Sequence, residues 1–336
     1  MKIRHFTIPV FIPEEACPNR CVFCNQHHIA GAEYTPTVEE VIMKVNTLLL
    51  TIPLGSEVEI GFFGGNFTGI PEKEQKAYLE CVQNYIETGR IQGIRISTRP
   101  DYISGEKLEF LKKYHVTTIE LGAQSLDNDV LKLAGRGHSA AQVYEASRLI
   151  REYKFSLGLQ MMIGLPGDTA EKSLFTAQEI ISLGATSTRI YPTLVIKNTE
   201  LEQLFLEGKY TALSLEEAVN RVADIVPLFI KAGVNILRIG LHPSEGLLDN
   251  TSLVAGPFHV AFGEMVFSEI WRRILSMLVF ENSKKNVLTI TVAPGMVNSA
   301  IGHKALNKAF LLESFRKVTF IESADLKGFE YNVDTV

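Results

Sequence analysis

Residues 16–26 read ACPNRCVFCNQ and contain three of the chain's four cysteines, Cys17, Cys21 and Cys24, with C-x3-C-x2-C spacing. The segment follows an apolar run at residues 6–12 that reads as a strand. Pairing two of these cysteines in a disulfide would leave one thiol over, so the short spacing favours a metal or iron–sulfur site in a reducing compartment. We therefore predict a metal-binding loop directly after the first strand.

The spacing alone is compatible with two kinds of site. On a [4Fe-4S] cluster, three cysteine ligands leave one iron open, and catalysis needs such an open position. A structural zinc site of the three cysteines with His27 or His28 is the alternative. Cys81 lies inside a helical pattern and is interpreted as a small buried hydrophobe, not as a fourth ligand.

Strand-like and helical patterns alternate along most of the chain. The expected strands cover residues 6–12, 58–63, 94–98, 117–121, 157–163 and 188–194, and a seventh run follows at 235–241. The expected helices cover residues 38–50, 72–88, 105–114, 140–153, 169–183 and 214–232. This order is typical of parallel βα units, which build a doubly wound sheet or a full or partial barrel. Functional residues are then expected at the C-terminal ends of the strands.

The pattern changes near residue 242, where we predict a boundary between a barrel domain (1–242) and a small α+β domain (243–336). The later elements are a loop at 244–257, a helix at 261–280, a strand at 287–292, a helix at 304–315 and a strand at 318–321. Residues 301–305, IGHKA, resemble the backbone-clamping loop of a KH module with its last glycine replaced by Ala305. A plain helical cap on the barrel is the alternative.

Composition limits the class of protein and its partners. Apolar residues make up 46% and charged residues 21% of the 336 positions, as in folded globular proteins. The net charge of −5 means that a nucleic-acid partner requires a local basic patch. No signal peptide and no apolar run of about 18 residues is evident, so we expect a cytoplasmic protein without a membrane partner.

Polar and glycine-containing motifs occur where the later strands end. Their candidate residues are Gly64, Gly65 and Asn66 after the second strand, Ser97 and Arg99 at the third, Glu120 and Gln124 at the fourth, Arg136 and His138 in the loop beyond, Ile163 at the fifth, and Arg189 and Tyr191 in the sixth. Ordinary structural interpretations remain open for several of them. Arg99 and Asp101 form an ion pair in one such interpretation, and Ile163 belongs to the core in another.

The cysteine spacing, with an aromatic residue before the last cysteine, resembles the radical S-adenosylmethionine (radical SAM) superfamily. The resemblance implies an α/β fold, a partial (β/α)6 TIM-like barrel with a small α+β C-terminal domain. It also implies a [4Fe-4S] cluster that reductively cleaves SAM to a 5′-deoxyadenosyl radical, which abstracts hydrogen from a substrate. A reducing electron donor of the flavodoxin or ferredoxin type would supply the electron.

The same resemblance assigns roles to individual residues. Cys17, Cys21 and Cys24 are implied as cluster ligands. Arg136 is implied to clamp the methionine carboxylate, and SAM contacts are also implied for Gly64, Gly65, Asn66, Ser97, Arg99, Glu120, Gln124 and Ile163. Arg189 and Tyr191 are the residues expected to face the substrate and to act in catalysis.

Five motifs resemble one subgroup, the radical domain of the elongator catalytic subunit, which modifies the tRNA wobble uridine, and its short bacterial relatives. They are CPNRCVFCNQ, GGNFT, STRPD, ELGAQS and RIYPTLVI. Residues 243–336 lack a glycine-rich loop that opens a helix, so we expect no acetyl-CoA partner. An RNA nucleoside is the expected substrate, and the alternatives are a porphyrin-type small-molecule radical SAM enzyme or a non-catalytic zinc- or RNA-binding protein.

Overall fold

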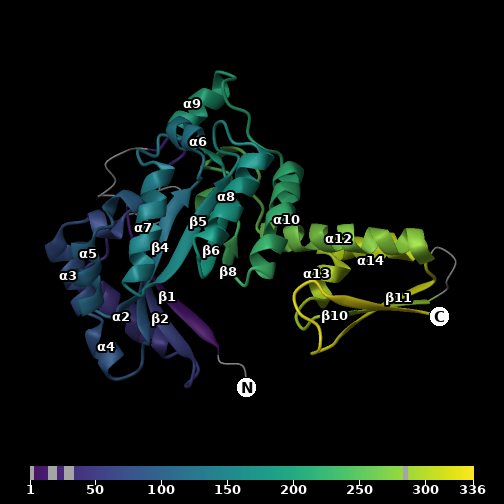
Figure 1. Cartoon of the computed structure of the whole chain (residues 1–336), viewed down its shortest axis with the longest axis horizontal. Helices are drawn as coiled ribbons and strands as arrows, with labels where there is room; N and C mark the ends of the chain where they lie inside the picture. The colour runs from purple at the N-terminus through teal and green to yellow at the C-terminus, as the bar shows by residue number, and fades with distance from the viewer. Residues whose placement is uncertain (1–3, 14–20, 26–33, 283–286) are drawn as a thin grey trace.

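The computed structural model describes residues 4–13, 21–25, 34–282 and 287–336. Its largest sheet has seven parallel strands in the order β1-β2-β3-β4-β5-β6-β8. They are β1 (His5–Ile12), β2 (Glu57–Gly64), β3 (Gly93–Thr98), β4 (Val116–Gln124), β5 (Ser156–Ile163), β6 (Ser187–Pro192) and β8 (Asn235–Ile239). The sheet curls into an open half-barrel with helices on its outside (Figure 1), which confirms the predicted fold class.

Most helices of this region begin where the sequence supplies a side-chain N-terminal cap. Thr37, Ser139 and Ser214 each form a capping box at the start of α2, α7 and α10. The helices are α2 (Val38–Leu49), α3 (Glu72–Glu80), α4 (Gln83–Glu87), α5 (Gly105–Lys113), α6 (Asn128–Leu133), α7 (Ala140–Glu152), α8 (Ala170–Ser182), α9 (Glu200–Leu206) and α10 (Leu215–Lys231). The single helix predicted at 72–88 is divided into α3 and α4, and the short helices α6 and α9 were not predicted.

Each strand of the half-barrel presents an apolar side to the helices and a more polar side to the lumen. Side chains alternate along a strand, so adjacent residues face opposite sides. Ile60, Leu121 and Leu159 are buried in the core between sheet and helices. Their neighbours Glu59, Glu120 and Gln160 face the lumen, together with Thr7, Arg95 and Arg189. The lumen therefore receives its polar side chains from several strands at once.

A smaller unit follows the half-barrel and extends to the right in Figure 1. Its elements are α12 (Phe262–Asn282), β10 (Val287–Val292), α13 (Val297–Ile301), α14 (Leu306–Leu312), β11 (Lys317–Glu322) and β12 (Tyr331–Thr335), with the sheet order β11-β10-β12. Helix α12 joins the two parts, because Phe262 and Val266 pack in the barrel core whereas Trp271 and Leu275 pack in the second core. The boundary at residue 242 stays a prediction.

The structure also contains short elements that the sequence did not predict. Residues 244–257 form α11 (Glu245–Leu248) and β9 (Leu253–Ala255), and β9 pairs with β7 (Val195–Ile196). In the loop between α13 and α14, Lys304 and Ala305 have positive φ angles of 53° and 58°. The KH-like interpretation of this loop stays a prediction. Within the described ranges, no helix combines the length and apolar content needed to cross a membrane.

Candidate active site

The described part of the cysteine loop is held at the C-terminal end of the sheet. Cys21 is buried, and the amide of Cys24 donates to its carbonyl over 3.0 Å. Between them, Val22 donates its amide to the Ala134 carbonyl (3.1 Å) and accepts from the Leu201 amide (2.8 Å). These two hydrogen bonds hold the loop between the end of α6 and the start of α9, so the sulfur of Cys21 has a defined position.

Cys17, His27 and His28 lie outside the described residues. Among the residues that are described, no three histidine, cysteine or acidic side chains are arranged to hold a metal ion. The cluster ligands Cys17, Cys21 and Cys24 therefore stay a prediction, and so does the choice between iron–sulfur and zinc on the basis of ligands alone.

Arg136 connects the cysteine loop to the edge of the sheet. Its Nη1 donates to Sγ of Cys21 over 3.2 Å, and its Nη2 donates to the Gly122 carbonyl. The Nε of Arg136 is buried and has no hydrogen-bond partner in the described part of the chain, and the same holds for Oε1 of Gln124. A Cβ on Gly122 would lie 3.1 Å from Gln124 and 3.3 Å from Arg136, so both side chains cross this glycine.

This pair of open groups fits the polar end of SAM. Buried polar atoms normally find partners, so a free donor on Arg136 and a free acceptor on Gln124 favour a ligand at this position. A guanidinium suits a carboxylate, and an amide oxygen accepts from a hydroxyl or ammonium group. SAM offers a carboxylate, an ammonium group and ribose hydroxyls. Gln124 itself has a left-handed φ of 67° at an irregularity in β4, which directs it away from the regular strand.

Arg99 is part of a buried network that supports Arg136. Its Nε and Nη2 each donate to the Asp101 carboxylate over 2.9 Å, and Nη2 also donates to the Arg136 carbonyl over 2.7 Å. Asn66 completes the connection, because its Oδ1 accepts from Thr98 (2.7 Å) and from the Arg99 amide (3.4 Å). The ion pair with Asp101 therefore exists, and it is buried. Direct contact of Arg99 with a cofactor stays a prediction.

Gly64 is required by a close approach of two strand ends. It has a φ of 133°, and a Cβ at this position would lie 1.7 Å from the Ile12 carbonyl oxygen. Any other residue would push the end of β1 away from the end of β2, and β1 leads directly into the cysteine loop. Gly65 and Asn66 follow at the same strand end, as the sequence motif predicts.

His138 is a buried neutral histidine beside this network. Burial, followed by the charges of Arg136 and Arg99, lowers the pKa of His138 to about 3. Its Nε2 lies 3.3 Å from the Ala123 carbonyl, which can only accept, so Nε2 carries the proton. The other ring nitrogen, Nδ1, is buried without a partner in the described part of the chain.

This buried histidine predicts a loss of stability in mild acid. In the unfolded chain His138 binds a proton below pH 6.5. In the folded protein it stays neutral until the pH falls to about 3. We expect His138 alone to lower the free energy of unfolding by about 1.6 kcal/mol between pH 6.5 and pH 5. Urea unfolding of the wild type and of His138→Gln at both pH values measures the contribution of His138 to this loss of free energy. Equal pH dependence in the two proteins would contradict it.

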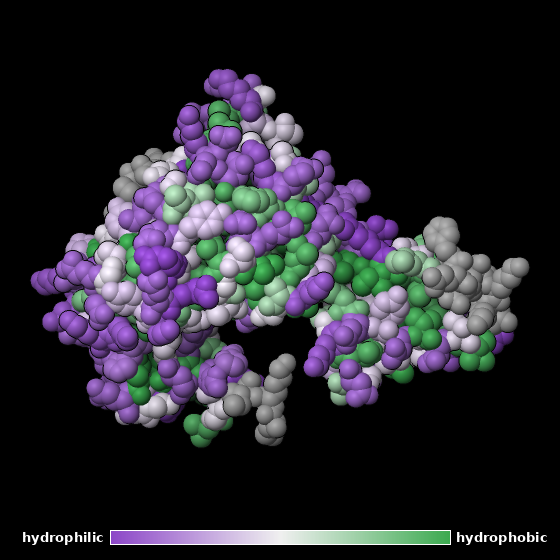
Figure 2. Space-filling model, viewed as in Figure 1, coloured by the Kyte–Doolittle hydropathy of each residue, from purple (hydrophilic) through white to green (hydrophobic). Residues whose placement is uncertain are grey.

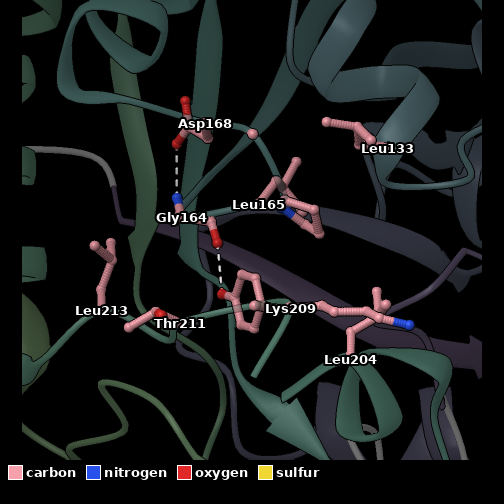
Figure 3. A pocket seen from close by; sticks show the side chains of 11 residues that line it. Leu133, Gly164, Leu165, Asp168, Leu204, Lys209, Thr211 and Leu213 are labelled. Carbon is pink, nitrogen blue, oxygen red and sulfur yellow. Dashed lines mark hydrogen bonds between the residues drawn. The ribbon is translucent and has the colours of Figure 1, made fainter. Parts of the chain in front are cut away.

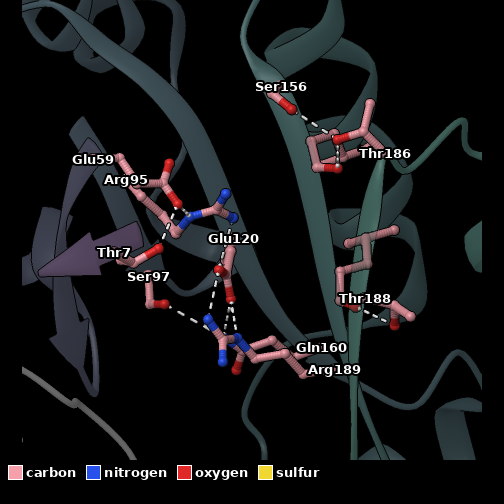
Figure 4. A network of polar contacts seen from close by, with 12 residues as sticks. Thr7, Glu59, Arg95, Ser97, Glu120, Ser156, Gln160, Thr186, Thr188 and Arg189 are labelled. Atoms are coloured by element: carbon pink, nitrogen blue, oxygen red, sulfur yellow. Dashed lines mark hydrogen bonds and ion pairs between the residues drawn. The ribbon is translucent and has the colours of Figure 1, made fainter. Parts of the chain in front are cut away.

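Glu120 is the centre of an ion-pair network in the lumen (Figure 4). It is 1% exposed. One oxygen accepts from Arg95 Nη1 (2.9 Å) and Arg189 Nη2 (3.1 Å), and the other accepts from Arg189 Nε (2.7 Å) and Gln160 (2.9 Å). Arg95 also pairs with Glu59 over 2.7 Å. Burial alone raises the pKa of Glu120, but Arg189, Arg95 and Gln160 outweigh it and hold that pKa below its usual range.

The surrounding residues leave space for this network. A Cβ on Gly158 would lie 2.8 Å from Cγ of Glu120, so a glycine in β5 lets Glu120 reach across to Arg189 on β6. The Arg189 guanidinium lies 5.2 Å from the centroid of the Phe63 ring, within the range of a cation–π contact. Phe63 in turn lies 6.1 Å from Phe11. The lumen thus combines aromatic rings with a fixed arginine layer.

Sequence reasoning missed several members of this lumen, namely Thr7, Glu59, Arg95, Gln160, Phe11 and Phe63. The signal was present, because charged residues inside strands of a parallel sheet covered by helices require a polar partner. Ser97 was predicted, and its Oγ accepts from Gln160 over 3.3 Å. Ile163 is not brought to the lumen: it is fully buried on the helix side of the sheet.

A cavity of about 320 Å³ lies beyond the end of β5 (Figure 3). Asp168 stabilises its wall by accepting from the Gly164 amide (2.7 Å), from Ser173 (2.7 Å) and from Arg221 (3.0 Å). The Tyr210 hydroxyl donates to the Gly164 carbonyl over 2.6 Å. Tyr210 also packs with Cys21 and Phe23 in one apolar cluster. The turn after β5 is therefore a rigid support for the cysteine loop.

Two family models match the chain. Residues 11–180 match the radical SAM superfamily, and residues 185–272 match the radical SAM C-terminal domain. The first match covers half of the chain. It includes all three clustered cysteines, Arg136 and Glu120, whereas Arg189 lies in the second match.

Curated relatives with similar sequences include a tRNA uridine(34) acetyltransferase and an Elongator complex protein 3. The chain is 29% identical over 252 residues to a tRNA uridine(34) acetyltransferase of Dehalococcoides mccartyi, covering 64% of this chain and 55% of that protein. It is 29% identical over 194 residues to Elongator complex protein 3 of Schizosaccharomyces pombe, covering 51% and 36%. The chain thus spans about half or less of the length of these relatives.

A solved structure with the same fold is the archaeal Elp3 of Methanocaldococcus infernus with an N-terminal deletion. Its TM-score is 0.65 at 22% sequence identity, and the match covers 81% of this chain and 64% of that one. At this level of identity the match establishes the fold alone.

Proposed function

Because the chain belongs to the radical SAM superfamily, we propose that it is a radical SAM enzyme that uses a [4Fe-4S] cluster on Cys17, Cys21 and Cys24. Members of the superfamily are enzymes, and the family implies both a cluster and SAM. The observation that carries the proposal is Arg136, which donates to the Cys21 sulfur and keeps a buried, unpartnered Nε next to Gln124. A structural zinc site has four protein ligands and no open coordination position, so it would bind no further ligand for the unpartnered groups of Arg136 and Gln124 to contact.

In this proposal the cofactors supply the radical chemistry and the chain positions them. When bound, the cluster and SAM provide the reductive cleavage that yields methionine and a 5′-deoxyadenosyl radical for hydrogen abstraction. The Nε of Arg136 would donate a hydrogen bond to the methionine carboxylate. The Oε1 of Gln124 would accept a hydrogen bond from a hydroxyl or ammonium group of SAM. Arg99, which donates to the Arg136 carbonyl, keeps the guanidinium in place.

For the substrate we propose an RNA nucleoside. The support is the names of the curated relatives, two of which are described as a tRNA uridine(34) acetyltransferase and an elongator component. The lumen supports it independently, since the Phe11 and Phe63 rings offer stacking surfaces for a base. An electron donor of the flavodoxin or ferredoxin type completes the proposed set of partners.

The wild-type protein provides the direct test. It is purified anaerobically, reconstituted with iron and sulfide, reduced, and supplied with SAM while 5′-deoxyadenosine is measured. We expect about four iron and four sulfide per chain and formation of 5′-deoxyadenosine. Deuterated tRNA, added as the substrate, should transfer deuterium into that product. A colourless protein with one zinc and no product would overturn the enzymatic proposal, and product without deuterium would overturn the RNA substrate.

The Arg136→Gln variant tests the proposed carboxylate contact. Loss of one charge-assisted contact of this kind is expected to weaken SAM binding by roughly tenfold to a hundredfold. Equilibrium dialysis with labelled SAM measures the dissociation constant, and iron analysis shows whether the cluster is retained. Arg148→Gln is a suitable control, because Arg148 is an exposed residue on α7 that pairs with Glu145 and Glu152. If an iron-loaded Arg136→Gln protein bound SAM with unchanged affinity, Arg136 would not be a SAM-binding residue.

A further inference from the structure

One side of the lumen contains a cation without a counterion. Arg189 in β6 and Arg238 in β8 are paired residues of neighbouring parallel strands, so their side chains leave the same face of the sheet. Arg189 is bound by Glu120. Arg238 is half-buried, and its side chain has no hydrogen bond or ion pair to any residue that the structure describes.

The carboxylates of the lumen are already used by other arginines. Glu120 accepts from both Arg95 and Arg189, and Glu59 accepts from Arg95 and Thr7. No carboxylate of this network is left for Arg238. Two like charges on neighbouring strands destabilise a sheet, and a partly buried charge without a partner adds to that effect. Among the residues that the structure describes, this edge of the sheet therefore has a surplus positive charge.

Tyr191 adds a neutral donor to the two arginines. It lies two residues after Arg189 in β6 and so faces the same side. Burial raises the pKa of the Tyr191 hydroxyl, and the charges of Arg189 and Arg238 act against that rise. The phenol is thus protonated at neutral pH and can donate a hydrogen bond.

We propose that Arg238, Tyr191 and Arg189 form an oxyanion subsite that takes a phosphate of the nucleotide substrate. Guanidinium and protonated phenol groups provide donors and cations, which match the several oxygens of a phosphate. Phe63, against which Arg189 packs, offers a ring to the attached base. β8 is the last strand of the open sheet, so Arg238 lies at its edge. This inference rests on the proposed RNA-directed function.

The test is a binding experiment that requires no SAM cleavage. Isothermal titration of the reconstituted protein with uridine 5′-monophosphate, uridine and acetate separates a phosphate contact from base binding and from carboxylate binding. We expect the monophosphate to bind at least tenfold more tightly than uridine or acetate. Arg238→Gln should weaken monophosphate binding by roughly tenfold to a hundredfold, and Tyr191→Phe by several-fold. Arg148→Gln, an exposed arginine on α7, should bind like the wild type.

Other outcomes would overturn the subsite. If uridine or acetate bound as tightly as the monophosphate, the subsite would not recognise a phosphate. If Arg238→Gln bound the monophosphate like the wild type, Arg238 would not belong to the subsite. If SAM competed with the monophosphate for binding, Arg238 would belong to the cofactor site and not to a separate phosphate subsite. The melting temperature of ligand-free Arg238→Gln should equal or exceed that of the wild type, because an unpaired cation is removed. A clear decrease would mean a structural role for Arg238. Failure in any of these arms leaves the 5′-deoxyadenosine assay as a separate test of the enzymatic proposal.

Discussion

The Cys21→Ala variant is expected to lose its iron–sulfur cluster and to form no 5′-deoxyadenosine above background. Cys21 is the buried cysteine whose sulfur accepts from Arg136, and its loop is held by backbone hydrogen bonds to Ala134 and Leu201. Alanine removes a sulfur that no neighbouring described side chain can replace, because the only other cysteine in this cluster, Cys24, is itself a proposed ligand. Iron and sulfide analysis, the visible absorption spectrum and the SAM cleavage assay all measure this effect.

Cys81→Ala is the matched control for this prediction. Cys81 is half-buried next to α3, donates to the Tyr78 carbonyl over 3.2 Å, and has its pKa raised by burial to about 11. Its thiol therefore stays protonated, whereas cluster ligands must be thiolates. We expect this variant to keep both iron and activity. Retained iron in Cys21→Ala, or lost iron in Cys81→Ala, would show that the proposed ligand set is wrong.

The Glu120→Gln variant should have a free energy of unfolding about 3 to 5 kcal/mol lower than the wild type. The amide keeps the shape of the side chain but removes the charge between Arg95 and Arg189, which are 11% and 17% exposed. Arg95 then keeps Glu59 as a counterion, whereas Arg189 has no other ion-pair partner among the described residues. Urea unfolding at pH 7 without SAM measures the loss separately from any effect on cofactor binding.

The pH dependence of this difference follows from the lowered pKa of Glu120. A carboxylate with a lowered pKa in the folded state stabilises the protein above the pKa of the unfolded chain, about 4.3, and loses that contribution as the pH falls. The gap between wild type and Glu120→Gln should therefore be full at pH 7 and shrink below about pH 4. Glu145→Gln, on the exposed surface of α7, should have little measurable effect. A gap that stays constant into acid would contradict the ion-pair explanation.

Much of the half-barrel was predictable because its elements are locally encoded. Short strand-like runs between helical patterns identified all seven strands of the large sheet, and in the structure the capping residues Ser139 and Ser214 precede two of the predicted helices. Short elements were missed for the opposite reason. β7 and β9 have too few residues to show a period, and they form because the tertiary fold brings Val195 next to Ala255.

Some features of the candidate site were also predictable from the sequence, and others were not. The sequence by itself determined the family, the strand ends on which the functional residues lie, and the clustered cysteines, because each depends on residue types at short spacing. Only the tertiary structure decided the partners: Arg136 with Cys21, Arg99 with the Arg136 carbonyl, and Glu120 with two arginines. These contacts join residues from 25 to 115 positions apart. Only the curled sheet and the loops at its C-terminal end bring such groups within hydrogen-bonding distance and remove the water that would otherwise separate them.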